Sequence, residues 1–240
     1  MAILTEQQIK RAKQILHECL AAKNEDGSRY WARDEELDRN RQEVITGQLR
    51  PLVDQYLAGK VDLKQFKSQI DSINKRNEHW GFKGIKGQMY FNMILNATDD
   101  LSECDNEIKA AIALPSSDEL ARSRIRTFMS YVKRIGDQYA ESHGAASRPK
   151  INSTPFFLSY FWQIQDAHTW PIYYTNSVEV LGRLNIWEPT DDVAESYIQF
   201  KQIHEELLEA FSKDHKHPFD LYGVEHVFWF EGQKPDAEPG

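Results

Sequence analysis

A glycine- and lysine-rich segment at residues 80–92, WGFKGIKGQMYFN, combines groups that can bind an anion. Glycines lie at positions 81, 84 and 87, with lysines between them, directly before a predicted helix. The free backbone amides of a glycine-rich turn, a helix N-terminus and flanking ammonium groups together form an anion site. We therefore expect contacts to phosphate or nucleic acid from Trp80, Lys83, Gly84, Lys86 and Gln88. The alternative is a tight turn whose glycines supply positive φ angles and let the neighbouring apolar side chains pack.

A second segment, residues 155–177, is dense in aromatic side chains with polar residues between them: PFFLSYFWQIQDAHTWPIYYTNS. Exposed aromatic rings stack on nucleic-acid bases, and nearby polar side chains read the hydrogen-bonding edges of those bases. On this interpretation the ligand contacts are Trp162, Gln165, Tyr173, Tyr174 and Asn176. One helix face cannot bury all of these rings, so either the segment lies at the centre of the core or some rings remain available to a ligand.

Charge is unevenly distributed along the chain. The formal net charge is −8, with −1 over residues 1–59, +3 over 60–150 and −10 over 151–240. Two regions are locally basic: 60–90 has 7 basic and 3 acidic side chains, and 120–150 has 7 and 2. The overall sign repels nucleic acid, but a local basic face can still bind phosphates. We therefore add Arg122 and Arg126 to the expected nucleic-acid contacts.

No catalytic motif accompanies these segments. The sequence contains no P-loop, no GxGxxG fingerprint and no GxSxG nucleophile turn. His204 and Glu205 resemble the start of a zincin motif, but Leu208 stands where the second histidine is required. His215 and His217 are two positions apart and cannot share one face of a helix. We expect no catalytic residue, no metal and no cofactor, and the sequence favours a binding module over an enzyme.

Export and membrane insertion are not expected. No stretch approaches the roughly 20 apolar residues that a bilayer span requires, and the N-terminal residues lack the apolar region of a signal peptide. Cys19 and Cys104 form no CxxC motif and are expected to be reduced and buried. These features indicate a cytoplasmic protein.

The elements that would carry these residues are mostly helices. Apolar residues recur at three- and four-residue spacing between cap and stop residues such as Thr5, Pro51, Gly59 and Asp62. The pattern predicts helices near 5–20, 33–43, 51–59, 62–73, 85–96, 101–114, 118–144, 155–164, 176–184 and 190–213. The expected fold class is therefore mainly α, a multi-helix globular domain with at most a small β element in the C-terminal third, around 170–174 and 226–231.

Two helical parts are expected to form one composite domain. A helical region at 1–144 is followed by a loop or linker at 145–154 and by an aromatic helical region at 155–231 that packs on the first. Residues 232–240 are polar and proline-rich, as in a flexible tail or the start of a linker. The core residues predicted from the apolar helix faces are Phe66, Ile70, Phe91, Ile94, Phe128, Val132, Phe157, Phe161 and Leu181.

Three phrases resemble the helical N-terminal modules that precede AAA+ motors in McrB-like restriction and defence proteins: WGFKGIKGQMYFNMI, PFFLSYFWQIQDAHTWPIYY and EHVFWF. The similarity extends over about residues 30–231. It implies a module that recognises a target, often modified DNA, while the motor and the nuclease lie elsewhere. It also implies an AAA+ motor as protein partner, in the same chain or as a separate subunit. The chain departs from the whole-protein pattern because its 240 residues contain no Walker A loop.

Three functions remain open. The first, which we favour, is a non-catalytic recognition module of a bacterial defence or restriction system that binds nucleic acid. The second is a helical scaffold or protein-interaction domain that uses the acidic C-terminal third. The third is an enzyme of unrecognised type with an aromatic-lined pocket. The salt dependence of nucleic-acid binding separates the first from the others, because phosphate contacts release counterions.

Overall fold

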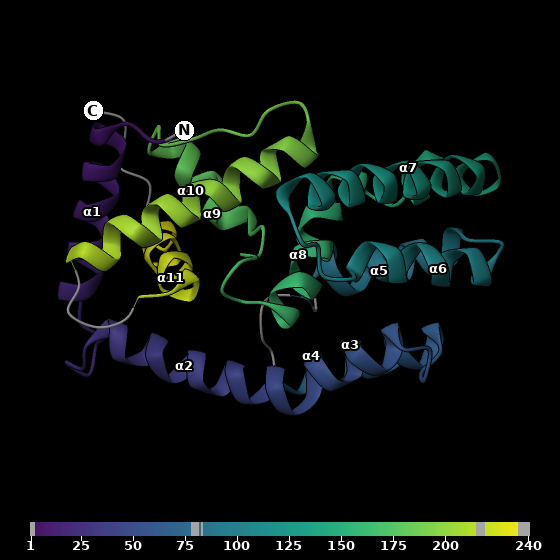
Figure 1. Cartoon of the computed structure of the whole chain (residues 1–240), viewed down its shortest axis with the longest axis horizontal. Helices are drawn as coiled ribbons and strands as arrows, with labels where there is room; N and C mark the ends of the chain where they lie inside the picture. The colour runs from purple at the N-terminus through teal and green to yellow at the C-terminus, as the bar shows by residue number, and fades with distance from the viewer. Residues whose placement is uncertain (1–2, 78–81, 83, 215–218, 235–240) are drawn as a thin grey trace. The chain divides into compact units, whose positions relative to one another are not determined.

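The computed structural model describes residues 3–77, 82, 84–214 and 219–234, and these residues are predominantly helical (Figure 1). Within these ranges there is no β-strand, and the only paired extended residues are Lys23 and Arg29, which form an isolated antiparallel bridge. The predicted mainly α fold class is therefore confirmed. None of the helices in the described part of the chain is long and apolar enough to cross a membrane.

Two compact units divide the chain. The terminal unit combines Met1–Asn40 with Tyr173–Gly240, and the central unit is Arg41–Ile172. The helices of the terminal unit are α1 (Glu6–Ala21), the first part of α2 (Tyr30–Val44), α9 (Thr175–Arg183), α10 (Val193–Asp214) and α11 (Leu221–Gly232). The central unit contains the end of α2 and then η1 (Ile45–Leu49), α3 (Arg50–Leu57), α4 (Leu63–Asn77), η2 (Ile85–Met89), α5 (Tyr90–Ala97), α6 (Leu101–Ile112), α7 (Asp118–His143), η3 (Ala145–Ser147), η4 (Ile151–Ser153) and α8 (Thr154–Gln165).

This division differs from the predicted succession of 1–144, 145–154 and 155–231. The predicted linker lies inside the central unit, where it forms the short helices η3 and η4 between α7 and α8. In the terminal unit, segments from both ends of the sequence meet: the amides of Ile3 and Leu4 donate to the carboxylate of Glu206 at 2.6 and 3.0 Å. Local composition does not reveal such a contact, because it joins residues 203 positions apart. Of the predicted tail, residues 235–240 lie outside the described part.

Helix boundaries follow the cap residues of the sequence. The hydroxyl of Thr5 accepts from the Gln8 amide at 3.3 Å and the Gln8 side chain accepts from the Thr5 amide at 2.8 Å, a capping box that starts α1. The hydroxyl of Ser117 accepts from the Leu120 amide at 3.2 Å and starts α7. Helix α7 ends before Gly144, whose φ of 84° is rare for any residue with a side chain.

One predicted β position is wrong, because residues 226–231 lie within α11. The aromatic and β-branched content of this segment is typical of strands. Residues 221–228 are all buried, however, so α11 is enclosed on nearly every side and shows no three- to four-residue hydrophobic period. Asp220 starts the helix by accepting from the Gly223 amide at 3.0 Å. Residues 170–174 are non-helical but do not pair into a strand.

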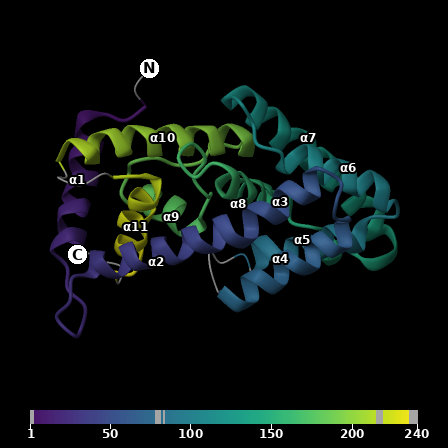
Figure 2. The same cartoon turned by 60° about the horizontal axis from the view of Figure 1, so that its bottom comes forward.

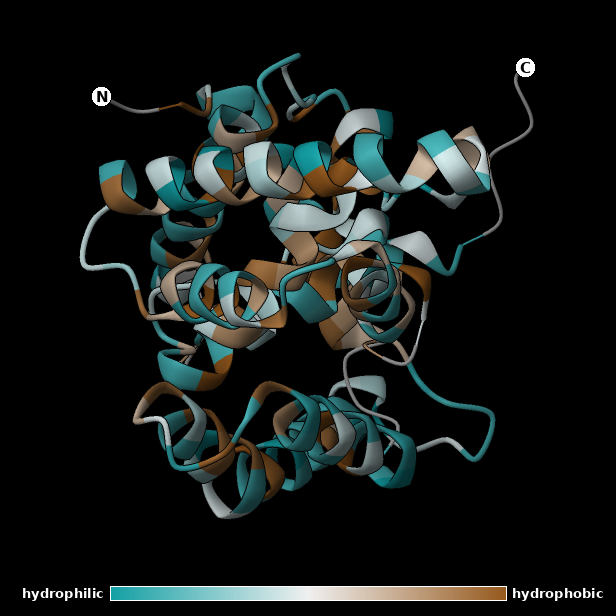
Figure 3. Ribbon diagram, turned by 90° about the vertical axis from the view of Figure 1, so that its right-hand side faces the viewer, coloured by the Kyte–Doolittle hydropathy of each residue, from teal (hydrophilic) through white to brown (hydrophobic). Residues whose placement is uncertain are grey.

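Each unit has its own apolar core. In the central unit, residues 154–164 of α8 are all buried, and the ring of Phe157 lies 5.3 Å from that of Phe91 and 6.0 Å from that of Phe128. In the terminal unit the core comes mainly from α1, α9, α10 and α11. All nine predicted core residues are buried, which confirms that prediction. Figure 3 shows hydrophobic and hydrophilic residues alternating along individual helices, as expected where one helix face packs inward.

Candidate nucleic-acid interface

The glycine- and lysine-rich segment forms a turn whose backbone amides are already bonded. The Gln88 amide donates to the Phe82 carbonyl at 2.6 Å, and the amides of Gly87 and Met89 donate to the Gly84 carbonyl at 3.3 Å. These three amides are therefore not available to an anion. Phe82 is itself completely buried. The geometry thus supports packing, rather than anion binding, as the role of the described part of this turn.

Close approach of two backbone segments accounts for the glycine at position 87. A Cβ there would lie 2.2 Å from the Phe82 carbonyl oxygen. Neither Gly84 nor Gly87 has a positive φ, so that part of the packing interpretation is wrong for these two glycines, while Gly81 lies outside the described residues. Lys86 and Gln88 are half-buried. Trp80 and Lys83 lie outside the described residues, and their contacts stay predictions.

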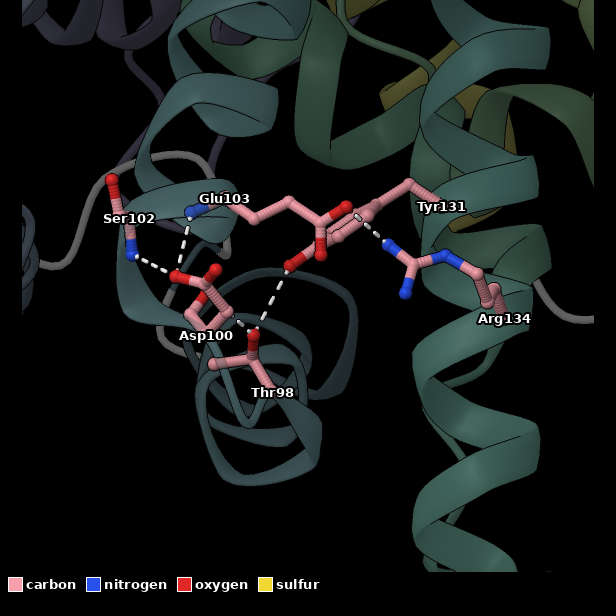
Figure 4. A network of polar contacts seen from close by, with 6 residues as sticks. All are labelled: Thr98, Asp100, Ser102, Glu103, Tyr131 and Arg134. Atoms are coloured by element: carbon pink, nitrogen blue, oxygen red, sulfur yellow. Dashed lines mark hydrogen bonds and ion pairs between the residues drawn. The ribbon is translucent and has the colours of Figure 1, made fainter.

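Acidic partners neutralise much of the basic region at 120–150. Arg134 of α7 bonds to Glu103 of α6 at 2.6 Å, in the polar network of Figure 4. Lys133 and Arg148 both pair with Asp137, at 2.7 and 3.1 Å. Less positive charge is therefore available to nucleic acid on α7 than the count of basic residues suggests.

The two arginines predicted as contacts lie on the N-terminal half of α7. Arg126 is exposed, whereas Arg122 is half-buried. Between them in sequence, the guanidinium of Arg124 donates to the Ala113 carbonyl at the end of α6, a structural role in the junction of the two helices. Arg122 and Arg126 thus remain candidate contacts of the central unit.

Two of the predicted aromatic-segment contacts belong to the core of the central unit. Trp162 is completely buried, and its indole N–H donates to the Ala111 carbonyl at 3.1 Å. The side-chain amide of Gln165 donates to the carbonyls of Ile112 and Phe161 at 2.8 and 2.9 Å. Both residues therefore tie α8 to the end of α6, and the indole of Trp162 has no exposed face on which a base could stack.

The other three predicted contacts belong to the terminal unit, so the unit boundary divides the predicted aromatic surface. Tyr173, Tyr174 and Asn176 are half-buried. The ring of Tyr173 lies edge-on to Phe200 at 5.0 Å, and burial raises the pKa of its hydroxyl to about 12. Asn176 packs against the backbone of Gly232. A Cβ added to Gly232 would lie 2.3 Å from the side-chain oxygen of Asn176. These contacts pack Tyr173 on α10 and the first turn of α9 on the end of α11.

A row of exposed polar side chains on α4 is better suited to phosphate contact. Its members recur at three- to four-residue spacing on one side of the helix, opposite the buried apolar face. We call this row the α4 cation face; it consists of Lys64, Ser68, Ser72, Lys75 and Arg76. None of its three cations forms an ion pair with any residue that the structure describes. Lys67, on the adjacent side of α4, is instead paired with Asp71.

Sequence reasoning located positive charge within 60–90 but assigned the contacts to Lys83 and Lys86. The spacing of the α4 cation face was visible in the sequence, because Lys64, Ser68 and Ser72 are four residues apart. What the spacing could not show is which lysines of the helix are neutralised by acidic neighbours. That distinction depends on side-chain geometry.

A pocket of about 310 Å³ adjoins the α4 cation face, where η1 and α3 pack against α4. Figure 2 shows α3 and α4 side by side. The hydrogen-bonding side chains that line the pocket are Gln48, Gln55, Gln69, Ser72 and Arg76. Ser72 and Arg76 are shared with the α4 cation face, so the row of cations and the pocket form one continuous candidate site.

Apolar side chains form the remaining wall of the pocket. Leu52 and Ile73 are buried and Pro51 is exposed, and all three line it. Gly47, in the π-helical segment η1, also lines the pocket. Among the residues that the structure describes, no carboxylate lines the pocket, so the described lining offers an anion only neutral and positive groups.

This arrangement combines cations that can bind phosphate with neutral hydrogen-bonding side chains. No known family model, characterised protein or solved structure matches the chain significantly.

Proposed function

We propose that the chain is a non-catalytic recognition module that binds nucleic acid through the α4 cation face of the central unit. One observation carries the proposal. Three exposed cations on one helix face have no acidic partner in the described part of the chain, whereas Lys67 on the same helix and two basic residues of α7, Lys133 and Arg134, do.

The dimensions of this face suit a nucleic-acid strand. Lys64 and Lys75 are eleven positions apart on the helix, which corresponds to a rise of about 16 Å. At about 3.4 Å of helix axis per phosphate, this distance spans roughly five phosphates of one strand of a duplex. Ammonium, guanidinium and serine hydroxyl groups all donate to phosphate oxygens. Such contacts hold the strand in place without reading its sequence.

Charge separates the two units and supports the choice of the central one. The central unit has 17 basic and 15 acidic side chains, a net charge of +2, whereas the terminal unit has 12 and 22, a net charge of −10. A unit with the strongly negative net charge of the terminal unit repels phosphate. We therefore expect binding to be modest in affinity, steeply dependent on salt and confined to the central unit.

The cellular setting rests on the resemblance of the three sequence phrases to McrB-like modules. In this setting the chain recognises DNA, modified DNA included, for a bacterial restriction or antiviral defence system, and an AAA+ motor is its protein partner. Comparison of methylated and unmodified duplexes of one sequence tests the preference for modified DNA. Equal affinity for the two would remove that part of the proposal.

A matched pair of double variants tests the α4 cation face. Lys75→Gln with Arg76→Gln removes two charges from the face, and Lys10→Gln with Arg11→Gln removes an identical exposed Lys-Arg pair from α1 of the terminal unit. Fluorescence anisotropy with labelled DNA at low salt should show a loss of affinity of about tenfold or more in the first variant only, since each phosphate contact contributes several-fold. Thermal melts of both variants control for folding, because cations in the last turn of a helix add about 0.3–1 kcal/mol each. Equal affinities for the two variants would contradict the assignment.

A second candidate is a protein-interaction domain, which the acidic charge of the terminal unit favours. That function requires no nucleic-acid affinity at all. The same titration therefore tests the first candidate against the second: a chain that binds neither DNA nor RNA at low salt is not a nucleic-acid module.

A further inference from the structure

The pocket between η1, α3 and α4 contains chemistry that phosphate contact alone does not need. Three glutamines and one serine line it beside a single guanidinium. Each glutamine amide supplies two N–H donors and a carbonyl acceptor. A ligand that satisfies this set has several neutral donors and acceptors on a planar edge and one anionic group.

Arg76 is the only charged side chain among the described residues that line the pocket. A guanidinium binds a phosphate or carboxylate through two parallel N–H donors, which orients the anion as well as attracting it. The anionic group of the ligand is therefore expected at the α4 end of the pocket. The wall formed by Pro51, Leu52 and Ile73 can cover the flat face of a ring.

Gly47 lines this pocket without a side chain. It has an ordinary negative φ, and a Cβ built there would meet nothing within 4 Å. Neither backbone conformation nor packing therefore requires a glycine, although glycine within a helix is less stable than alanine by about 1 kcal/mol. Gly87 in η2 is different, because the Phe82 carbonyl leaves no room for a side chain. Short π-helical segments such as η1 are common at functional sites.

From this set of groups we infer that the pocket binds a nucleoside 5′-monophosphate unit. Arg76 receives the phosphate, the glutamines and Ser72 bond to the edge of the base or sugar, and the apolar wall covers the ring. The volume of about 310 Å³ is at the lower end of small-molecule sites and fits one such unit. The unit can be a free mononucleotide or the 5′-phosphorylated end of a strand, and only the second source rests on the proposed function.

Two variants in the pocket test the inference without touching the cations. Gly47→Leu adds a side chain to the pocket lining, and Gln69→Leu removes one amide at similar volume; both positions are exposed, so the fold should tolerate the changes. Calorimetric titration of the full chain with AMP, CMP, GMP and UMP should give a measurable affinity for at least one of them. Either variant should weaken this affinity by about tenfold or more: Gln69→Leu removes a hydrogen-bonded contact, and Gly47→Leu takes up space in the lining. Inorganic phosphate and the matching nucleoside should each bind more weakly than the nucleotide.

The second arm compares oligonucleotides with and without a 5′-phosphate. A preference for the phosphorylated end that disappears in Gln69→Leu assigns the pocket to strand ends, whereas free nucleotide binding without this preference assigns it to a soluble ligand. The inference would be overturned if the chain showed neither free nucleotide binding nor a preference for the phosphorylated end. It would also be overturned if neither variant changed the measured affinities. Loss of oligonucleotide binding in Lys75→Gln with Arg76→Gln would still support the proposed function in that case, so the two can fail separately.

Discussion

Acidification should destabilise the terminal unit through His204, a histidine that is completely buried in α10. Its Nδ1 lies 2.8 Å from the Phe200 carbonyl, to which it donates, and its Nε2 has no hydrogen-bond partner among the residues that the structure describes. The ring packs 4.0 Å from that of Phe200. A protonated imidazole at this position would place a charge among apolar side chains, so burial lowers its pKa from 6.5 to about 4.

The direction and size of the effect follow from linkage. At neutral pH the imidazole is uncharged in the folded and unfolded chains, so it has no pH-dependent influence on stability. As the pH falls through 6.5, the unfolded chain takes up a proton that the folded chain does not accept until about pH 4. The free energy of unfolding therefore falls across this window, by about 2.5 kcal/mol at about pH 4.5, and levels off below the folded pKa.

Urea unfolding of the wild type and His204→Leu, followed by circular dichroism at several pH values, measures this contribution. Other groups titrate in the same range, so the difference between the two curves is the relevant quantity. His17→Leu, at an exposed position of α1, is the matched control. The wild type should lose about 2.5 kcal/mol more than His204→Leu between about pH 7 and pH 4.5. Parallel curves for the two proteins would refute the burial of an uncharged imidazole.

Two further predictions concern packing in the central unit. Phe91→Ala and Phe161→Ala should each cost on the order of 3–5 kcal/mol in the free energy of unfolding, because both rings are completely buried; near-wild-type melting of either variant would show that these helix faces are misassigned. Gly87→Ala should destabilise by about 1–3 kcal/mol, because its Cβ would meet the Phe82 carbonyl, while Gly47→Ala should be neutral or stabilising. A melting temperature for Gly87→Ala that equals that of Gly47→Ala would contradict the geometry of η2.

Much of the fold was predictable because most helices here are amphipathic and capped. Helix α4 shows this well: Phe66, Ile70 and Ile73 repeat at helical spacing, and all three are buried. Helix α11 was not predictable in this way, because burial on nearly all sides removes the period on which the argument depends.

The candidate site was predictable only in part. The charge count pointed to 60–90, and the α4 cation face lies there. Pairing across helices, such as Arg134 with Glu103, depends on which faces meet and is not visible in local sequence. Glycine-lysine composition was equally ambiguous at Gly87, since close packing and anion binding both require small residues. The pocket arises where η1 and α3 pack against α4, a tertiary contact that no local pattern specifies.

The salt dependence of DNA affinity tests the central claim most directly, because it counts the phosphate contacts made by the α4 cation face. The logarithm of the binding constant should fall linearly with the logarithm of the salt concentration, by about 0.9 for each phosphate contact on duplex DNA. Removing Lys75 and Arg76 by substitution with glutamine should reduce the slope by about 1.8, while the Lys10 and Arg11 control keeps the wild-type slope. An unchanged slope in the Lys75 and Arg76 variant would contradict the account, since these cations would then touch no phosphate.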